Sequence, residues 1–109
     1  METAKVTIIV PKWATINGKR VPFGDSTRQQ FEQMLLRNAG GFTLLETKGA
    51  WLDNANNRVD DASLTYTMYC ANNPSILANL KAQAKFIKDN LKQDAVLFSV
   101  ESVTSLVFV

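Results

Sequence analysis

The sequence predicts an α+β fold of the ferredoxin-like type, a sandwich in which two helices cover one face of an antiparallel sheet. Strand-like and helix-like segments follow one another in the order β-α-β-β-α-β. Both helix-like segments carry an apolar stripe on one side, as helices packed on a sheet do. No linker, repeat or low-complexity segment divides the 109 residues, and this length suits a single domain over residues 1–109.

The first strand is predicted to begin near Lys5 and to end at Pro11, because residues 6–10 are all β-branched and a proline prevents further pairing in a sheet. Residues 13–24 are predicted to form a loop. The dipeptide of Asn17 and Gly18 is typical of a turn, and the proline and glycine that follow it interrupt regular structure.

The first helix is predicted to begin at Ser26, where Gln29 completes a capping box three residues later. It is predicted to end near Asn38, because two consecutive glycines follow. The second helix is predicted to begin after Asn73, a favourable N-cap, with Pro74 in its first position. Its apolar residues recur at three- and four-residue intervals and form the buried stripe: Leu77, Leu80, Ala84, Ile87 and Leu91.

Between the two helices, extended runs over residues 42–52 and 63–70 flank an asparagine-rich connection. This pattern predicts a β-hairpin with a long tip. Side chains alternate between the faces of a strand, so Leu44 and Glu46 are predicted on one face of the first arm and Leu45 on the other.

The segment 95–109 is rich in Val, Leu and Phe. It predicts either two short strands around a bend or one long bulged strand. An apolar strand at the edge of a sheet promotes aggregation unless it is covered. We therefore expect a partner subunit to cover it.

The composition excludes several classes of chemistry. The chain has no histidine, which excludes Ser-His-Asp hydrolysis, Cys-His proteolysis and most zinc sites, so no cofactor or metal is expected. Cys70 is the single cysteine, and the N-terminal residues lack the features of a signal peptide, so the protein is predicted to be cytoplasmic. The apolar runs are too short for a membrane span, so no membrane partner is expected.

The charge balance of the whole chain is small. A net charge of +2 predicts no nucleic-acid partner. The second helix nevertheless carries several lysines, for which a solvated face is the simpler interpretation and steering of an anionic ligand the alternative. They are Lys81, Lys85, Lys88 and Lys92.

The residues with most potential for chemistry gather at the tip of the predicted hairpin, where Trp51 lies close in sequence to Asp60 and Asp61. Two interpretations stay open from the residues alone. The two aspartates are either a polar turn that starts the return strand, or one of them holds a cation beside the indole ring. Which aspartate points inward depends on the strand register, and we favour Asp61. Glu46 and Glu101 are weaker candidates.

Three parts of the sequence also match a known pattern in combination. Residues 45–51 read LETKGAW, an acidic pair precedes the strand that ends at Cys70, and residues 92–108 read KQDAVLFSVESVTSLVF. Together they resemble the small S-adenosylmethionine lyases known chiefly from bacteriophages. The resemblance covers residues 45–109.

The resemblance implies a homotrimer of ferredoxin-like, PII-like subunits with ligand sites between subunits. It also implies a reaction that needs no histidine. The carboxylate of S-adenosylmethionine, or of an adenylylated derivative, attacks the γ-carbon of the same molecule, expels methylthioadenosine and leaves homoserine lactone. The enzyme must fold the substrate for this attack, which is worth about 7–11 kcal/mol in favourable intramolecular cases.

The predicted site follows from this resemblance. Asp61 is predicted to be the catalytic residue, because its carboxylate would anchor the ammonium or sulfonium charge of the substrate. Trp51 looks equivalent to a tyrosine of the family, and Asp61 to a glutamate. The substrate-binding residues are predicted to be Trp51, Asp60, Glu46, Tyr66, Ser99 and Glu101.

Two other functions stay open. A non-catalytic PII-like module would bind an adenine nucleotide and signal through its hairpin. No glycine-rich phosphate loop is present, so basic side chains would have to hold the phosphates, namely Lys12, Lys19, Arg20 or Arg58. A trimeric structural or inhibitory protein would instead contact a partner through the acidic tip.

Overall fold

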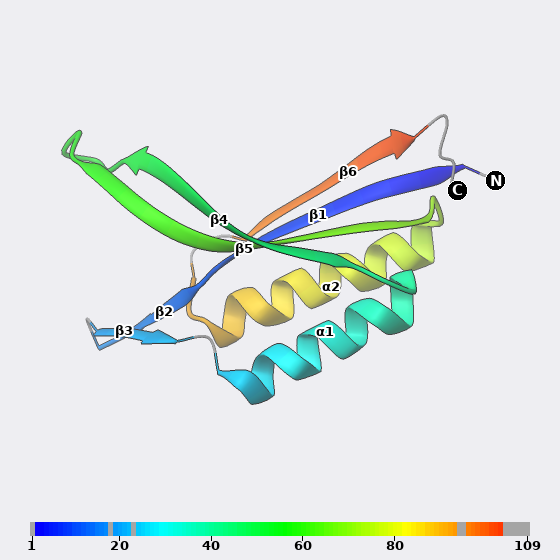
Figure 1. Cartoon of the computed structure of the whole chain (residues 1–109), viewed down its shortest axis with the longest axis horizontal. Helices are drawn as coiled ribbons and strands as arrows, with labels where there is room; N and C mark the ends of the chain where they lie inside the picture. Colours follow the sequence, from blue (N-terminus) through cyan, green and yellow to red (C-terminus); the bar gives the residue numbers. More distant parts are fainter. Residues whose placement is uncertain (1, 18, 23, 94–95, 104–109) are drawn as a thin grey trace.

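Four strands form an antiparallel sheet, and both helices lie on one of its faces (Figure 1). The computed structural model describes residues 2–17, 19–22, 24–93 and 96–103. The strand order in the sheet is β4-β5-β1-β6, which confirms the predicted ferredoxin-like sandwich. The elements are β1 (Thr3–Pro11), β2 (Trp13–Ile16), β3 (Lys19–Pro22), α1 (Asp25–Ala39), β4 (Thr43–Leu52), β5 (Arg58–Ala71), α2 (Pro74–Asn90) and β6 (Leu97–Val103).

The core lies between the sheet and the helices. Every second residue of β1 is buried, because alternate side chains of a strand point to the same face. The same alternation buries one face of β5, and α1 adds Phe31 and Leu35. Burying an aliphatic or aromatic side chain contributes about 1.5–3 kcal/mol, so this layer supplies most of the stability. Its strand residues are Ala4, Val6, Ile8, Val10, Leu64, Tyr66, Met68 and Cys70.

The helix boundaries agree with the sequence in all but one respect. The Asn73 side chain accepts hydrogen bonds from the backbone N–H groups of Ser75 (2.8 Å) and Ile76 (3.3 Å), which confirms the predicted cap of α2. Gly40 ends α1 in the left-handed conformation, with φ of 83°. The predicted capping box is wrong, because α1 begins at Asp25 and its N-cap, Gly24, has no side chain with which to cap.

Residues 13–22 form a second, smaller hairpin instead of the predicted loop. β2 and β3 pair antiparallel, with Trp13 opposite Pro22 and Ile16 opposite Lys19. Asn17 makes the tight turn possible because it adopts a φ of 52°, a left-handed conformation that asparagine tolerates better than most residues. Pro22 is accommodated because it lies at the end of a short edge strand.

The return arm of the large hairpin starts at Arg58, five residues earlier than predicted. The tip therefore takes up residues 53–57 alone. The Asp53 carboxylate accepts hydrogen bonds from the N–H groups of Ala55 and Asn57, both at 2.9 Å, and closes the turn. Asp53 thus has a structural role as an Asx-turn residue.

β6 is one strand, paired with β1, over the described part of the segment 95–109. Residues 104–109, where a second strand was an alternative, lie outside the described residues. Neither helix of the described chain has the length and apolar character needed to cross a membrane.

Candidate functional site

The β4–β5 hairpin extends past the ends of both helices, so no helix covers its outer half (Figure 1). The two arms pair in a continuous register, in which Trp51 lies opposite Val59 and Gly49 lies opposite Asp61. Residues directly opposite each other in an antiparallel pair present their side chains on the same face. The register therefore determines which side chains of the hairpin share a surface.

The two aspartates lie on opposite faces of the hairpin. Asp61 shares a face with Trp51, on the side of the sheet away from the helices, which we call the open face. Asp60 lies opposite Ala50, on the face that the helices cover farther along the sheet. Trp51 is 55% exposed. A Cβ atom on Gly49 would have no neighbour within 4 Å, so the open face has free space beside the Asp61 carboxylate.

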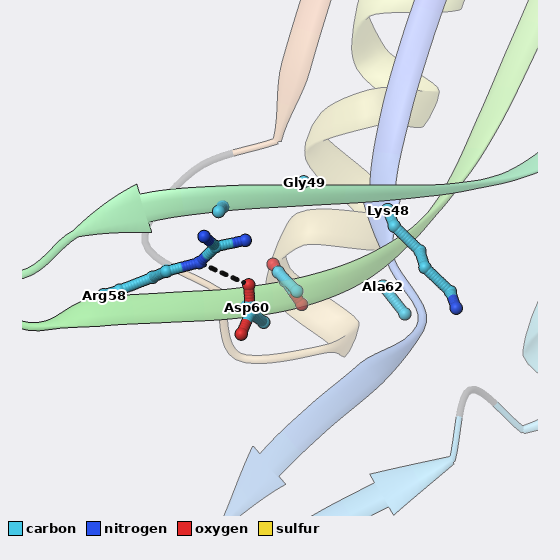
Figure 2. Close-up of a pocket in the computed structure, with 7 residues that line it drawn as sticks. Lys48, Gly49, Arg58, Asp60 and Ala62 are labelled. Atoms are coloured by element: carbon cyan, nitrogen blue, oxygen red, sulfur yellow. Dashed lines mark hydrogen bonds and ion pairs between the residues drawn. The ribbon is translucent and has the colours of Figure 1, made fainter.

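A cavity of about 600 Å³ adjoins the hairpin (Figure 2). Its basic and acidic groups balance one another, and the Arg58 Nε donates a hydrogen bond to the Asp60 carboxylate at 2.9 Å. The other lining residues, Gly49, Ala50 and Ala62, have small side chains or none, which leaves room for the cavity. Such a mixture of charges suits a ligand that carries both signs, as an amino acid does. The lining residues are Lys48, Gly49, Ala50, Arg58, Asp60, Asp61 and Ala62.

Glu46 is engaged elsewhere. Its side chain lies on the same face as Asp60, and its carboxylate forms an ion pair with the Lys12 Nζ at 3.4 Å. Both side chains are exposed, and exposed ion pairs contribute about 0–1 kcal/mol. The pair lies on the opposite face of the hairpin from Trp51, so the structure does not bring Glu46 to the predicted site.

The structure also corrects the expectation for Tyr66. Its side chain is fully buried between the sheet and α1, where its ring packs edge-on against Phe31 and Phe42 with centroids 5.2 and 5.4 Å away. Its hydroxyl donates a hydrogen bond to Glu32 at 2.7 Å, and Arg28 donates to the same carboxylate oxygen at 3.0 Å. The ring supports the core and has no surface to offer a substrate.

Replacing the Tyr66 hydroxyl is expected to affect stability in a pH-dependent way. Burial, together with the hydrogen bond to Glu32, raises the pKa of Tyr66 above its ordinary value. The folded state therefore holds the phenol proton more tightly than the unfolded state. The resulting contribution to the free energy of unfolding is complete below the ordinary tyrosine pKa of about 10 and is lost as the pH rises above it.

We expect Tyr66→Phe to lower the free energy of unfolding by about 1.5–3 kcal/mol near pH 7, the usual range for a hydrogen bond to a charged group. The difference between wild type and variant should shrink as the pH rises past about 10. Urea unfolding of both proteins across this range measures it. A difference that stayed constant with pH would show that the phenol does not hold its proton in this way.

Ser99 and Glu101 lie on the open face but far from the hairpin tip. Glu101 is opposite Lys5 on β1, and Lys5 is opposite Tyr69 on β5. Tyr69 is eight residues along β5 from Asp61, a distance of about 26 Å at about 3.3 Å per residue. Within one copy of the chain, Glu101 and Asp61 therefore cannot contact the same small ligand, and two copies would be needed to bring them together.

The sequence interpretation missed the contribution of Lys48 to the cavity. The sequence signal that could have indicated it is the set of small residues at positions 49, 50 and 62. Small side chains on paired strands leave a hollow that neighbouring charged side chains line. Within the described ranges, no three acidic or cysteine side chains gather in a way that would hold a metal ion.

Comparison with known proteins gives the class of fold. No protein-family model matches the sequence, and no curated protein sequence matches it. GlnK of B. subtilis, solved with ATP, is 15% identical with a TM-score of 0.65, over 94% of this chain and 83% of that chain. The periplasmic divalent cation tolerance protein CutA of Archaeoglobus fulgidus is 7% identical with a TM-score of 0.64, over 96% and 87%. The domain thus has the predicted PII-like ferredoxin fold.

A phage S-adenosylmethionine lyase has the same fold. Its complex with S-methyl-5'-thioadenosine is 12% identical to this chain with a TM-score of 0.62, over 94% of this chain and 90% of that chain. The predicted structural similarity to the phage lyases is therefore confirmed at the level of the fold.

Proposed function

We propose that the protein is an S-adenosylmethionine lyase whose substrate binds on the open face of the hairpin. The proposal rests on the strand register, which puts the Asp61 carboxylate and the exposed Trp51 indole on one face with free space at Gly49. The fold shared with a phage lyase solved with S-methyl-5'-thioadenosine supports it. An anionic group beside an aromatic ring is an arrangement that binds organic cations.

The reaction makes modest demands on side chains. A bond forms between a carboxylate oxygen of the substrate and its γ-carbon while the bond from that carbon to sulfur breaks. The electron pair of the broken bond goes to the sulfur, so the sulfonium becomes the neutral thioether of S-methyl-5'-thioadenosine and the rest becomes homoserine lactone. No proton moves at the reacting carbon, so no general base is required. A chain without histidine is therefore suited to this chemistry.

The role of Asp61 follows from the change in charge. The sulfonium loses its charge during the reaction, so a carboxylate held against it would stabilise the substrate more than the transition state. The ammonium group keeps its charge throughout. We therefore assign Asp61 to the ammonium, where it orients the substrate for attack without opposing the reaction.

A second copy of the chain completes the proposed site. Ser99 and Glu101 are on the open face but at the far end of the sheet from Asp61, so they would enter the same pocket from a neighbouring subunit of a homotrimer. The mass in solution tests this assembly, because a trimer has three times the 12.1 kDa of one chain.

A second candidate function has its own observation. Lys48 and Arg58 line the cavity beside the hairpin, and a GlnK structure with ATP shares the fold. A regulatory module that binds an adenine nucleotide would use such basic groups for the phosphates.

Incubation with S-adenosylmethionine, followed by chromatography, distinguishes the two functions. Formation of S-methyl-5'-thioadenosine and homoserine lactone supports the lyase. Thermal stabilisation by ATP, without turnover of S-adenosylmethionine, supports the regulatory module. The lyase proposal is contradicted if S-adenosylmethionine stays intact and does not raise the melting temperature of the protein.

Trp51→Ala is expected to raise the KM for S-adenosylmethionine about 5- to 30-fold, because a desolvated cation over an indole is worth about 1–2 kcal/mol. Leu52→Ala is the matched control. Leu52 is the next residue, is 64% exposed, and points to the opposite face. Its KM should stay within about twofold, since surface substitutions away from a site have effects within about 0.5 kcal/mol. Equal effects of both substitutions would contradict binding on the open face.

A further inference from the structure

Lysines form a row along one flank of α2. Lys81, Lys85 and Lys88 recur at intervals of four and three residues, which places them on one side of a helix. Lys92 follows four residues later, just beyond the end of the helix. We call these four residues the lysine row. The row lies to the side of the buried stripe formed by Leu80, Ala84, Ile87 and Leu91.

The row concentrates the positive charge of the chain. Over residues 74–92, from the start of α2 to Lys92, the four lysines and the single acidic residue Asp89 give a net charge of +3. The whole chain has a net charge of +2, so all other residues together sum to −1. Among the ion pairs within the described residues, none involves a lysine of the row. The small total charge therefore conceals a strongly polarised surface.

Helix stability does not account for this arrangement. A lysine in the last turn interacts favourably with the helix dipole, which explains Lys88 and Lys92. Lys81 and Lys85 lie too far from the helix end to benefit. Neighbouring like charges at three- and four-residue spacing repel one another, so the row weakens the helix unless an anionic partner is bound.

We propose that the lysine row binds the phosphate backbone of duplex nucleic acid, a function separate from the proposed lyase site. Phosphate contacts need positive charge and little else. Protein interfaces, in contrast, are depleted in lysine and rely on aromatic anchors, and the exposed large apolar residues of the described chain lie outside α2. Insertion into a membrane surface would need an exposed apolar helix face, whereas the apolar face of α2 is buried in the core.

The chemistry of the row also favours a duplex over a single strand. Binding of single strands relies on aromatic rings on which bases stack. On α2 the aromatic residue is Phe86, which packs against the core. Binding that uses phosphates without contacts to bases is expected to be weak, independent of sequence and strongly dependent on salt.

The test is fluorescence anisotropy of a labelled DNA duplex of about 20 base pairs, titrated with the full chain. Non-specific binding has dissociation constants of about 10⁻⁶–10⁻⁴ M, and four phosphate contacts should weaken it about 100-fold between about 50 and 200 mM salt. In the double variant Lys85→Gln/Lys88→Gln, two contacts are lost. The slope of log K against log salt should then fall from about −3.6 to about −1.8.

The matched control is Lys19→Gln/Arg37→Gln, which removes the same charge from two exposed residues outside the row. Its slope should equal that of wild type. Equal weakening in both variants would show that total charge governs binding and would overturn the proposal. So would a lack of binding at about 50 mM salt, or tighter binding to phosphatidylserine vesicles or to polyglutamate than to the duplex.

Thermal unfolding followed by circular dichroism checks that the variants fold. Loss of the favourable dipole interaction of Lys88 is offset by removal of like-charge repulsion, so the melting temperature of the double variant should stay close to that of wild type. If the double variant unfolds, the single variant Lys85→Gln replaces it, with an expected loss of about one in the slope.

Discussion

Asp61→Asn is expected to reduce kcat/KM for S-adenosylmethionine by about 100-fold while the chain remains folded. An interaction with a charged group contributes about 1.5–3 kcal/mol, and a misplaced substrate reduces the rate further. Asp61 makes no hydrogen bond or ion pair to another described residue, and Gly49 opposite it leaves the carboxylate accessible. Neutralising it should therefore remove the proposed contact with the substrate without disturbing the hairpin. Chromatography of the reaction products measures the rate.

Asp60→Asn is the matched control, because it makes the same chemical change one residue away on the opposite face. Its ion pair with Arg58 is exposed, and such pairs contribute little. We expect kcat/KM to stay within about threefold of wild type, since surface changes away from a site have effects within about 0.5 kcal/mol. Full activity of Asp61→Asn would contradict the proposed site. A loss in Asp60→Asn alone would move the site to the cavity that Asp60, Lys48 and Arg58 line.

Phe31→Ala is expected to lower the free energy of unfolding by about 3–5 kcal/mol, the range for truncating a buried aromatic ring. The Phe31 ring is fully buried and packs edge-on against Tyr66 with centroids 5.2 Å apart. Its loss leaves a cavity beside the Tyr66–Glu32 hydrogen bond. Because small domains are stable by about 5–15 kcal/mol in total, this change brings the protein close to unfolding. Urea denaturation measures the effect.

Leu36→Ala provides the comparison on the same helix. Leu36 is 41% exposed, so the leucine loses little packing when it is shortened. Its effect should be below about 1 kcal/mol, as for surface substitutions away from special features. Similar effects of the two substitutions would contradict the burial pattern, in which Phe31 belongs to the core and Leu36 does not.

Local patterns were sufficient to predict the sheet, the helices and most of the core. The three- and four-residue repeat of α2 identified which of its side chains face inward, and the β-branched run over residues 6–10 identified the central strand β1. The hairpin of β2 and β3 was missed. Asn17 indicates the turn, but the residues on either side of it show little apolar alternation that would indicate strands. The extra length of β5 was missed because three of its first four residues are charged, namely Arg58, Asp60 and Asp61, and they belong to the strand through backbone pairing with β4.

The site was harder to predict, because it depends on register and distance. The pairing of Gly49 with Asp61 decides which aspartate shares a face with Trp51, and the sequence does not specify that pairing. The neighbours of Tyr66 in sequence lie on the open face. Tyr66 must therefore point to the core, a consequence of strand alternation that the sequence interpretation overlooked. The separation of Glu101 from Asp61 depends on the register of β5 and β6 against β1, which places Glu101 level with Tyr69 and therefore far along the strand direction from Asp61.

The opposite orientation of Asp60 and Asp61 also restricts how the length of the hairpin can vary among related proteins. An insertion within the tip, residues 53–57, lengthens the turn and leaves both faces unchanged. A single insertion in β5 between Asp61 and the buried part of the strand reverses every side chain from that point to the tip and would exchange the two aspartates, whereas a single insertion in β4 before Gly49 would move Trp51 to the other face. Relatives that preserve the same surface should therefore differ in arm length by even numbers of residues, or contain a bulge that restores the parity.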